Sequence, residues 1–432
     1  MKVDEDISFA KLKMLWFVNL DYKAGMHHGG NLRFFNYAKE LASRGHDVYF
    51  VVHRKKVDDV VARKKCLDDL KQQGTITDYF EIDYEYPRPR GKLSHIVTYP
   101  MLANHLLRKY QVSTISTLKD IIADKQINFC LFSDRHLLFV LPAINQDVRT
   151  VIDWVDCYVL YHIRQIAVSL KKRQLTGLPK SVRYLIDAFA QESYYGKRCA
   201  MNLVVSPVDK QYLDVINRVT DRNSVLLNGV EVKNPRDGAD KIKNRIIFTG
   251  NMNFPPNHEA AIWFIDHVLP LILKRKSDVK FVVAGANPLE DLLGRRNSNI
   301  EVAGYVEGMG QEIAKSELYV APLVSGGGFK NKVVEAIANG TFVVATSMAV
   351  EFLGPDVQKQ LLVADAPEAM AQHVLAFLDN PQEFETRLET LKNLFSNEFT
   401  WANRTNELIS IARGTPAYDV QDALILKTSV RH

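Results

Sequence analysis

Short apolar runs rich in β-branched residues alternate with longer amphipathic stretches along almost the whole chain. Strands are predicted at 14–20, 47–52, 79–84, 128–133, 150–155 and 202–206, and again at 245–250, 280–285, 300–306, 318–323, 341–346 and 361–365. Helical patterns lie between them, for example at 30–44 and 182–199. Strands that are apolar on both faces and separated by helices are typical of parallel sheets covered by helices on both sides. The sequence therefore predicts an α/β fold.

The chain of 432 residues is too long for one ordinary hydrophobic core. A polar segment near 229–244 carries Pro and Gly and divides the strand and helix pattern into two halves. We predict a first domain at 1–228 and a second at 229–400. The remaining 401–432 hold a helical pattern at 401–414 and a tail, and by analogy with two-domain folds this helix is expected to return to the first domain.

The formal net charge of +5 is too small to indicate a nucleic-acid partner. Two basic runs are local, one at 88–92 and one at Lys171, Lys172 and Arg173. They are interpreted as solvated loops, or else as contacts with acidic lipid headgroups or a phosphorylated acceptor.

The four cysteines form no C-x-x-C pair, which fits a reducing compartment and suggests no metal cage. No run reaches the roughly 18 apolar residues that a membrane span needs. The first residues, MKVDEDISFAKLK, are polar and acidic, unlike a signal peptide. We expect a cytoplasmic protein, and peripheral contact with the inner face of the cytoplasmic membrane stays open.

The stretch SGGGFKNKVVEAIA (325–338) follows a predicted strand and opens a predicted helix. Its glycines Gly326, Gly327 and Gly328 let the backbone approach a ligand closely, and a helix start offers free amides and a positive dipole end. Lys330 and Lys332 add positive charge, which suits a pyrophosphate. Glu335, one turn into the helix, could accept hydrogen bonds from the hydroxyls of a ribose. The alternative is a glycine-rich turn with a capped helix and solvated lysines.

The run GGGFKNKVVEAIANGTFVVAT (326–346) resembles the donor-site signature of family four, the "group 1" glycosyltransferases. Four more stretches resemble the family in the same order along the chain. They are HHGGNLRFFNYAKELASRGHDVYFV (27–51), LLNGVEV (226–232), TGNMNFPPNHEA (249–260) and EVAGYVEGM (301–309). The stretch at 249–260 is similar to the corresponding loop in a bacterial exopolysaccharide branch of the family.

The resemblance implies the GT-B fold, with two Rossmann-like domains whose parallel sheets face each other across a cleft. The first domain would bind the acceptor and the second the nucleotide-sugar donor. Glu335 would hold the donor ribose, and Lys330 and Lys332, with amides near Gly326, Gly327 and Gly328, the diphosphate. The other implied donor contacts are Gly29 and Gly30 from the first domain, Gly250 and Asn251 on the far wall, and Tyr305 and Val306 beside the base.

The family transfers a sugar with retention of configuration and without a metal ion. The resemblance also implies two partners, a UDP- or GDP-sugar as the donor and a glycan or lipid-linked molecule as the acceptor. No cofactor and no nucleic acid are expected. Two positions depart from the family pattern. Gly327 replaces a glutamate that usually contacts the donor sugar, and the loop NMNFPPN (251–257) lacks the usual Arg and Lys.

Other side chains and functions remain open. Asp153 and Asp156 follow a strand and suit either a ligand contact or a helix cap. His136 is expected to be a surface histidine. His27 and His28 suit either a contact of one of them with the sugar or a plain loop role. Asp4, Glu5 and Asp6 match the D-x-D metal-binding motif of the other large glycosyltransferase fold, and we interpret this match as chance. The rival functions are a nucleotide-sugar epimerase or hydrolase, and a nucleotide-binding protein without catalysis. A nicotinamide-dependent oxidoreductase would need a third glycine where the chain has Asn331.

Overall fold

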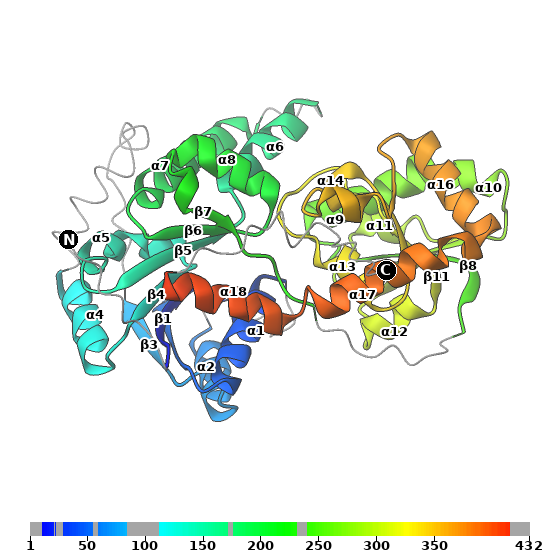
Figure 1. Ribbon diagram of the computed structural model, residues 1–432. Coiled ribbons are helices and arrows are strands. Elements are labelled where there is room, and N and C mark those ends of the chain that lie inside the picture. Colours follow the sequence, from blue (N-terminus) through cyan, green and yellow to red (C-terminus); the bar gives the residue numbers. More distant parts are fainter. Residues whose placement is uncertain are drawn as a thin grey trace. The chain divides into compact units, whose positions relative to one another are not determined.

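The structure is a computed structural model that describes residues 11–20, 22, 29–54, 59–83, 112–171, 176–230 and 240–414. The chain forms two compact units (Figure 1). The first comprises Met1–Gly229 and Trp401–Ala417, and the second comprises Val230–Thr400. Each unit contains its own parallel sheet with helices packed around it.

The sheet of the first unit has the strand order β3-β2-β1-β4-β5-β6-β7. Its strands are β1 Lys13–Val18, β2 Asp47–Arg54, β3 Asp78–Asp83, β4 Phe129–Phe132, β5 Arg149–Val155, β6 Met201–Val204 and β7 Asn223–Val225. The helices are α1 Gly29–Ser43, α2 Val60–Gln72, α4 Val112–Asp124, η1 Arg135–Val140, α5 Leu141–Ile144, α6 Tyr158–Lys171, α7 Leu178–Gly196, α8 Pro207–Asn217, η2 Thr220–Arg222 and α18 Trp401–Arg413.

The sheet of the second unit has the strand order β10-β9-β8-β11-β12-β13. Its strands are β8 Ile242–Thr249, β9 Lys280–Ala284, β10 Ile300–Gly304, β11 Ser316–Ala321, β12 Phe342–Ala345 and β13 Leu362–Val363. The helices are α9 Pro255–Trp263, η3 Phe264–Val268, α10 Leu269–Leu273, α11 Glu290–Leu293, α12 Met309–Ala314, α13 Asn331–Ala338, α14 Ser347–Val350, α15 Pro355–Gln358, α16 Pro367–Asp379, η4 Pro381–Phe384 and α17 Glu385–Asn397.

The predicted α/β class with two parallel sheets is confirmed, and every predicted run contains a strand. The central strands are buried on both faces, as in β1 and β11, because helices cover both sides of each sheet. The edge strand β7 was missed, since its three residues, Asn-Ser-Val, carry too little apolar pattern to be recognised.

A buried ion pair inside the first unit joins Arg33 on α1 to Asp153 on β5. Arg33 donates through Nε to Asp153 Oδ2 at 2.8 Å and through Nη2 to Oδ1 at 3.0 Å. Its Nη1 reaches the Leu226 carbonyl at 3.0 Å and Asn228 Oδ1 at 2.8 Å. Asp153, which the sequence left open as a ligand contact or a helix cap, is therefore an internal partner of α1.

Helix α18 packs against α1 within the first unit. The Tyr37 and Trp401 rings meet edge to face with their centroids 5.2 Å apart. A Cβ on Gly229 would lie 2.5 Å from the backbone of Trp401, so only glycine allows the two segments to approach so closely. Leu408 and Ile411 complete the buried face of the helix.

We expect Arg33→Ala to destabilise the first unit by about 3–5 kcal/mol, because the Asp153 carboxylate would stay buried without its partner. Lys39→Ala, at an exposed position of the same helix, should change the stability by less than about 0.5 kcal/mol. Urea unfolding followed by tryptophan fluorescence measures both, since Trp16, Trp154 and Trp401 all belong to this unit. Equal, small effects of the two substitutions would contradict the stabilising role of the pair.

Candidate functional site

The strand order of the second unit contains one reversal of direction, between β8 and β11. The chain runs outward from β8 to β9 and β10, and then crosses to β11 on the other side. The place where the strand order reverses is the topological switch point of the sheet. Ligands of open parallel sheets bind there, outside the carboxyl ends of the strands. Gly250 follows β8 and the Gly326–Gly328 loop follows β11, so two predicted segments meet at this edge.

Three glycines with positive φ close the carboxyl ends of neighbouring strands: Gly250 (φ 155°), Gly285 (φ 141°) and Gly304 (φ 70°). The Gly285 amide donates to the Gly304 carbonyl at 2.7 Å. A Cβ on Gly285 would lie only 1.8 Å from the Gly250 carbonyl oxygen. At this edge the backbone segments therefore approach each other closely, with no side chain between them. Gly285 was not predicted as a site residue, although its position directly after a buried strand was a usable signal.

The Gly326–Gly328 loop has left-handed backbone at Gly326 (φ 105°) and at Gly328 (φ 70°). Lys330, the residue before α13, is buried, and its ammonium donates to the Gly327 carbonyl at 2.5 Å and the Gly328 carbonyl at 2.8 Å. The Glu351 carboxylate lies 4.0 Å from the same ammonium. Two of the three N–H groups of the Lys330 ammonium thus stabilise the conformation of the loop.

Lys332 and Glu335 lie on the first turns of α13 and are both partly buried. Lys332 Nζ donates to Asn257 Oδ1 and lies 4.6 Å from the centre of the Phe248 ring. A Cβ on Gly250 would be 3.0 Å from this nitrogen. The structure therefore brings Gly250, Lys332 and Glu335 together, and adds Asn257, which the sequence reasoning left out of the site although it belongs to the quoted motif at 249–260.

Burial dominates the ionisation of this pair. It lowers the pKa of Lys332 to about 7, although the carboxylate of Glu335 works in the opposite direction. Burial likewise raises the pKa of Glu335, and the charge of Lys332 opposes that rise. The Glu335 carboxylate accepts no hydrogen bond from the part of the chain that the structure describes. A ligand with hydroxyl donors and negative charge would satisfy both groups.

The remaining predicted residues lie around this edge or in the first unit. Asn251 turns its Oδ1 toward the Asn253 amide, at 3.2 Å, and the Asn287 side chain, at 3.3 Å. Tyr305 follows Gly304 and is 79% exposed, which leaves its ring open for stacking, and Val306 beside it is partly buried.

Two predicted residues belong to the first unit. Gly29 and Gly30 begin α1, while His27 and His28 lie outside the described residues.

In the first unit the corresponding reversal lies between β1 and β4. After β4, Asp134 caps η1 by accepting from the His136 amide at 2.9 Å, and His136 itself is exposed. Arg135 was not predicted. Its guanidinium stacks over the Tyr158 ring at 3.5 Å and donates to the buried Glu192 carboxylate at 2.6 Å. Its Nε finds no hydrogen-bond partner among the described residues.

Next to this site Val155, at the end of β5, has a φ of 65°. A β-branched residue rarely adopts this left-handed conformation, and such strain is concentrated at functional sites. The strain supports the carboxyl edge of this sheet as a functional edge as well.

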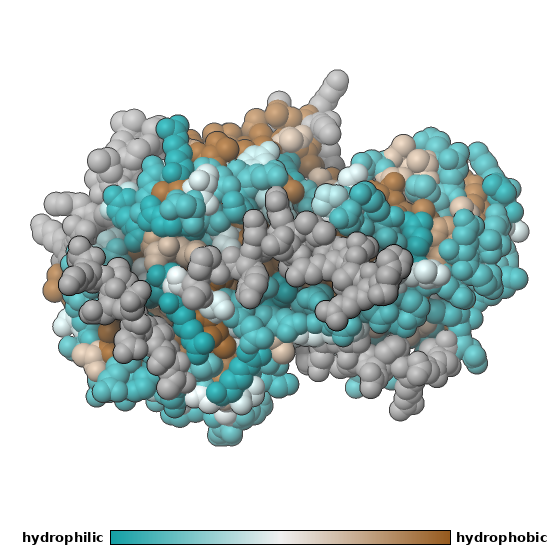
Figure 2. Space-filling model, in the orientation of Figure 1, coloured by the Kyte–Doolittle hydropathy of each residue, from teal (hydrophilic) through white to brown (hydrophobic). Residues whose placement is uncertain are grey.

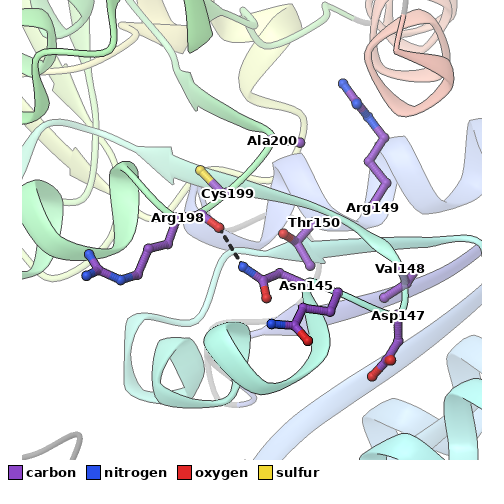
Figure 3. A pocket seen from close by; sticks show the side chains of 9 residues that line it. Asn145, Asp147, Val148, Arg149, Thr150, Arg198, Cys199 and Ala200 are labelled. Atoms are coloured by element: carbon purple, nitrogen blue, oxygen red, sulfur yellow. Dashed lines mark hydrogen bonds between the residues drawn. The ribbon is translucent and has the colours of Figure 1, made fainter. Parts of the chain in front are cut away.

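The open hollow in Figure 3 has a volume of about 470 Å³ and lies at the opposite edge of the first sheet, at the amino ends of β5 and β6. Asn145 Nδ2 donates to the Arg198 carbonyl at 3.0 Å across it. The side chains of Arg149 and Arg198 point away from each other. This hollow therefore has neither the location nor the converging polar groups of a ligand site.

Across the described residues, no group of three or more His, Cys, Asp or Glu side chains is placed to hold a metal ion. Asp4, Glu5 and Asp6 lie outside those residues.

Comparison with known proteins points in one direction. Residues 243–380 match the family model described as Glycosyl transferases group 1. A Klebsiella pneumoniae protein, described as an uncharacterized 44.6 kDa protein in the cps region, is 23% identical over 380 residues, which cover 84% of this chain and 90% of that protein. A phosphatidyl-myo-inositol mannosyltransferase of Mycobacterium tuberculosis is 26% identical over 200 residues, which cover 43% of this chain and 52% of that protein.

Solved structures agree in fold. A glycosyltransferase from Rickettsia africae superposes with a TM-score of 0.64 at 13% identity, over 94% of this chain and 99% of that one. Anabaena HepE in complex with UDP and glucose superposes with a TM-score of 0.60 at 14% identity, over 93% and 100%.

The two parallel sheets, with a glycine-lined edge and a partly buried lysine and glutamate at the switch point of the second, form the GT-B fold. The predicted resemblance to the group 1 glycosyltransferases is confirmed by the match to the family model. The match covers most of the second unit, which is therefore similar to the group 1 glycosyltransferases.

We expect Gly285→Ala to destabilise the second unit by about 3 kcal/mol or more, because its Cβ would overlap the Gly250 carbonyl and its φ is unfavourable for alanine. Gly294→Ala is the matched control. The nearest atom to its Cβ lies at 3.4 Å, and Gly294 caps α11 with ordinary helical backbone, so its effect should stay below about 0.5 kcal/mol. Urea unfolding followed by Trp263 fluorescence reports on this unit. A well-tolerated Gly285→Ala would show that the two glycine loops need not touch.

Proposed function

We propose that the protein transfers a sugar from a nucleoside-diphosphate sugar, a UDP- or GDP-sugar, to a glycan or lipid-linked acceptor, with retention of configuration and without a metal ion. The observation that carries this proposal is the clustering of Lys332, Glu335 and the Gly326–Gly328 loop at the switch point of the second sheet. The second unit is then the donor domain and the first unit the acceptor domain.

The donor would lie along the glycine-lined edge. The diphosphate would meet the amides near Gly327 and Gly328, the start of α13 and the ammonium of Lys332. Glu335 would accept hydrogen bonds from the two ribose hydroxyls, and the exposed Tyr305 ring would stack on the base. Lys330 would act mainly through the loop, because its donors already bind the Gly327 and Gly328 carbonyls.

In the reaction, the bond between the anomeric carbon and the diphosphate oxygen breaks while a bond to the acceptor oxygen forms on the same face. The acceptor proton passes to the departing phosphate oxygen, so no side-chain nucleophile is needed. Amides, a helix end and Lys332 stabilise the charge that develops on the diphosphate. Because Gly327 has no carboxylate to hold the sugar, sugar contacts must come from backbone or from other residues.

Polysaccharide assembly is the proposed context. The Klebsiella relative is named for the cps region, HepE was solved with UDP and glucose, and the mycobacterial relative is named for a phosphatidyl lipid. The free state of all four cysteines supports a reducing, cytoplasmic location. Peripheral contact with the inner membrane face is part of the proposal, because a lipid-linked acceptor would be presented there.

Two alternative functions would use the same site. A nucleotide-sugar epimerase or hydrolase would need no acceptor, and a nucleotide-binding protein without catalysis would bind UDP or GDP and turn nothing over. The absence of a glutamate at Gly327 is the feature that favours the second.

The decisive assay incubates the protein with UDP- and GDP-sugars, with and without membrane extracts as a source of acceptor, in the presence of EDTA. We expect sugar incorporation that depends on the extract and is unaffected by the chelator. Sugar release without acceptor would favour hydrolysis, binding without any turnover would favour a binding protein, and a strict Mg²⁺ or Mn²⁺ requirement would contradict the metal-free mechanism.

We expect Glu335→Gln to weaken UDP or GDP binding by roughly 10- to 150-fold, since the loss of a charge-assisted hydrogen bond costs about 1.5–3 kcal/mol. Lys332→Ala should reduce turnover through lost stabilisation of the leaving group. Glu301→Gln, at an exposed position of β10, is the matched control and should bind normally. Isothermal titration calorimetry measures the affinities, and unchanged values in both site variants would refute the site.

A further inference from the structure

The helical hairpin of α6 and α7 leaves several of its apolar side chains exposed. From Tyr161 to Asp187, none of the residues that the structure describes is buried. Among the described residues, a small core of Cys157, Leu160, Ala188 and their neighbours anchors the base of the hairpin. A helix pair of this length inside a folded unit normally buries one apolar stripe, so the outer part of this hairpin has a different purpose.

The exposed apolar residues form stripes at helical spacing. On α7 they are Val182, Ile186 and Phe189, which are 40%, 57% and 52% exposed. On α6, Ile163 and Leu170 are 39% and 52% exposed. Figure 2 shows this surface as the brown area at the top of the first unit, where Figure 1 places α6 and α7. An apolar patch of this extent on a single hairpin marks an interaction site.

The charges of the hairpin indicate what covers it. Between Tyr158 and Asp187 the sequence contains six lysines and arginines but only one acidic residue, Asp187 itself. Arg164 directly follows Ile163, and Arg183 directly follows Val182, so basic side chains flank the apolar stripes. A helix with exposed apolar residues and flanking Lys and Arg is suited to lie in the headgroup region of an anionic bilayer. A second copy of this chain would meet the same positive charges and be repelled.

We propose that the α6–α7 hairpin is a membrane-docking surface, which places its apolar stripes among lipid chains and its basic side chains against anionic headgroups. No helix among the described residues is both long and apolar enough to cross a bilayer. This docking surface rests on the proposed function, because a lipid-linked acceptor would be presented at a membrane. Its test requires no sugar transfer.

The experiment is co-sedimentation of the full chain with vesicles of phosphatidylcholine, alone or mixed with phosphatidylglycerol. We expect binding to the mixed vesicles only, weakened at least about tenfold when the ionic strength rises from about 0.05 to 0.5 M, because salt screens the headgroup attraction. The double variant Ile186→Ser with Phe189→Ser should lose at least about tenfold in affinity at low salt. The matched double variant Val112→Ser with Val215→Ser removes two exposed valines, 65% and 76% exposed, from α4 and α8, and should bind like the unmodified protein.

Thermal unfolding with and without UDP separates this proposal from the proposed function. The hairpin variant should melt and respond to UDP as the unmodified protein does, whereas a failed nucleotide site would remove the UDP response from every variant and leave vesicle binding intact. The proposal is overturned if the unmodified protein ignores anionic vesicles or if the hairpin and control variants bind equally. It is also overturned if light scattering reveals a dimer that the hairpin variant alone converts to monomer, which would assign the face to a second copy.

Discussion

The burial of a lysine and a glutamate at the switch point of the second sheet is the constraint around which the site is built. Removing two charges from water is costly unless partners compensate, and burial is the main cause that lowers the pKa of Lys332 to about 7. Its partners are specific: the Asn257 amide oxygen, the face of Phe248 and a backbone at Gly250 that has no Cβ. An anion beside Lys332 would restore the favourable charge state of the ammonium, which is why this edge of the sheet suits a diphosphate.

The residues around this edge of the second sheet keep it accessible to backbone contacts. Glycines at the ends of three adjacent strands allow backbone to form the surface, and the contact between Gly285 and Gly250 leaves no space for a side chain. Lys330 holds the glycine loop by the carbonyls of Gly327 and Gly328. The first unit is organised differently. A buried Arg33–Asp153 pair holds α1 to the sheet, while the α6–α7 hairpin leaves several apolar residues exposed.

Much of this could be predicted from the sequence because its signals are local. Buried parallel strands are continuous apolar runs, and the loop, lysines and glutamate at 326–335 occur within one turn and one helix. Contacts between distant segments could not be predicted. The pairing of Lys332 with Asn257, the approach of Gly285 to Gly250 and the stacking of Arg135 on Tyr158 depend on which strand ends become neighbours. Asp153 was ambiguous for the same reason, since its partner Arg33 is 120 residues away.

Hydrogen–deuterium exchange with and without UDP tests the central claim most directly, because it reports on backbone amides at the seat of the diphosphate. Slower exchange with UDP is predicted for peptides that cover Gly326–Asn331 and Gly250–Asn257, and unchanged exchange for the amino edge of the same sheet, at Lys280 and Ser316. Protection that appears elsewhere while both of these loops exchange as before would contradict the account.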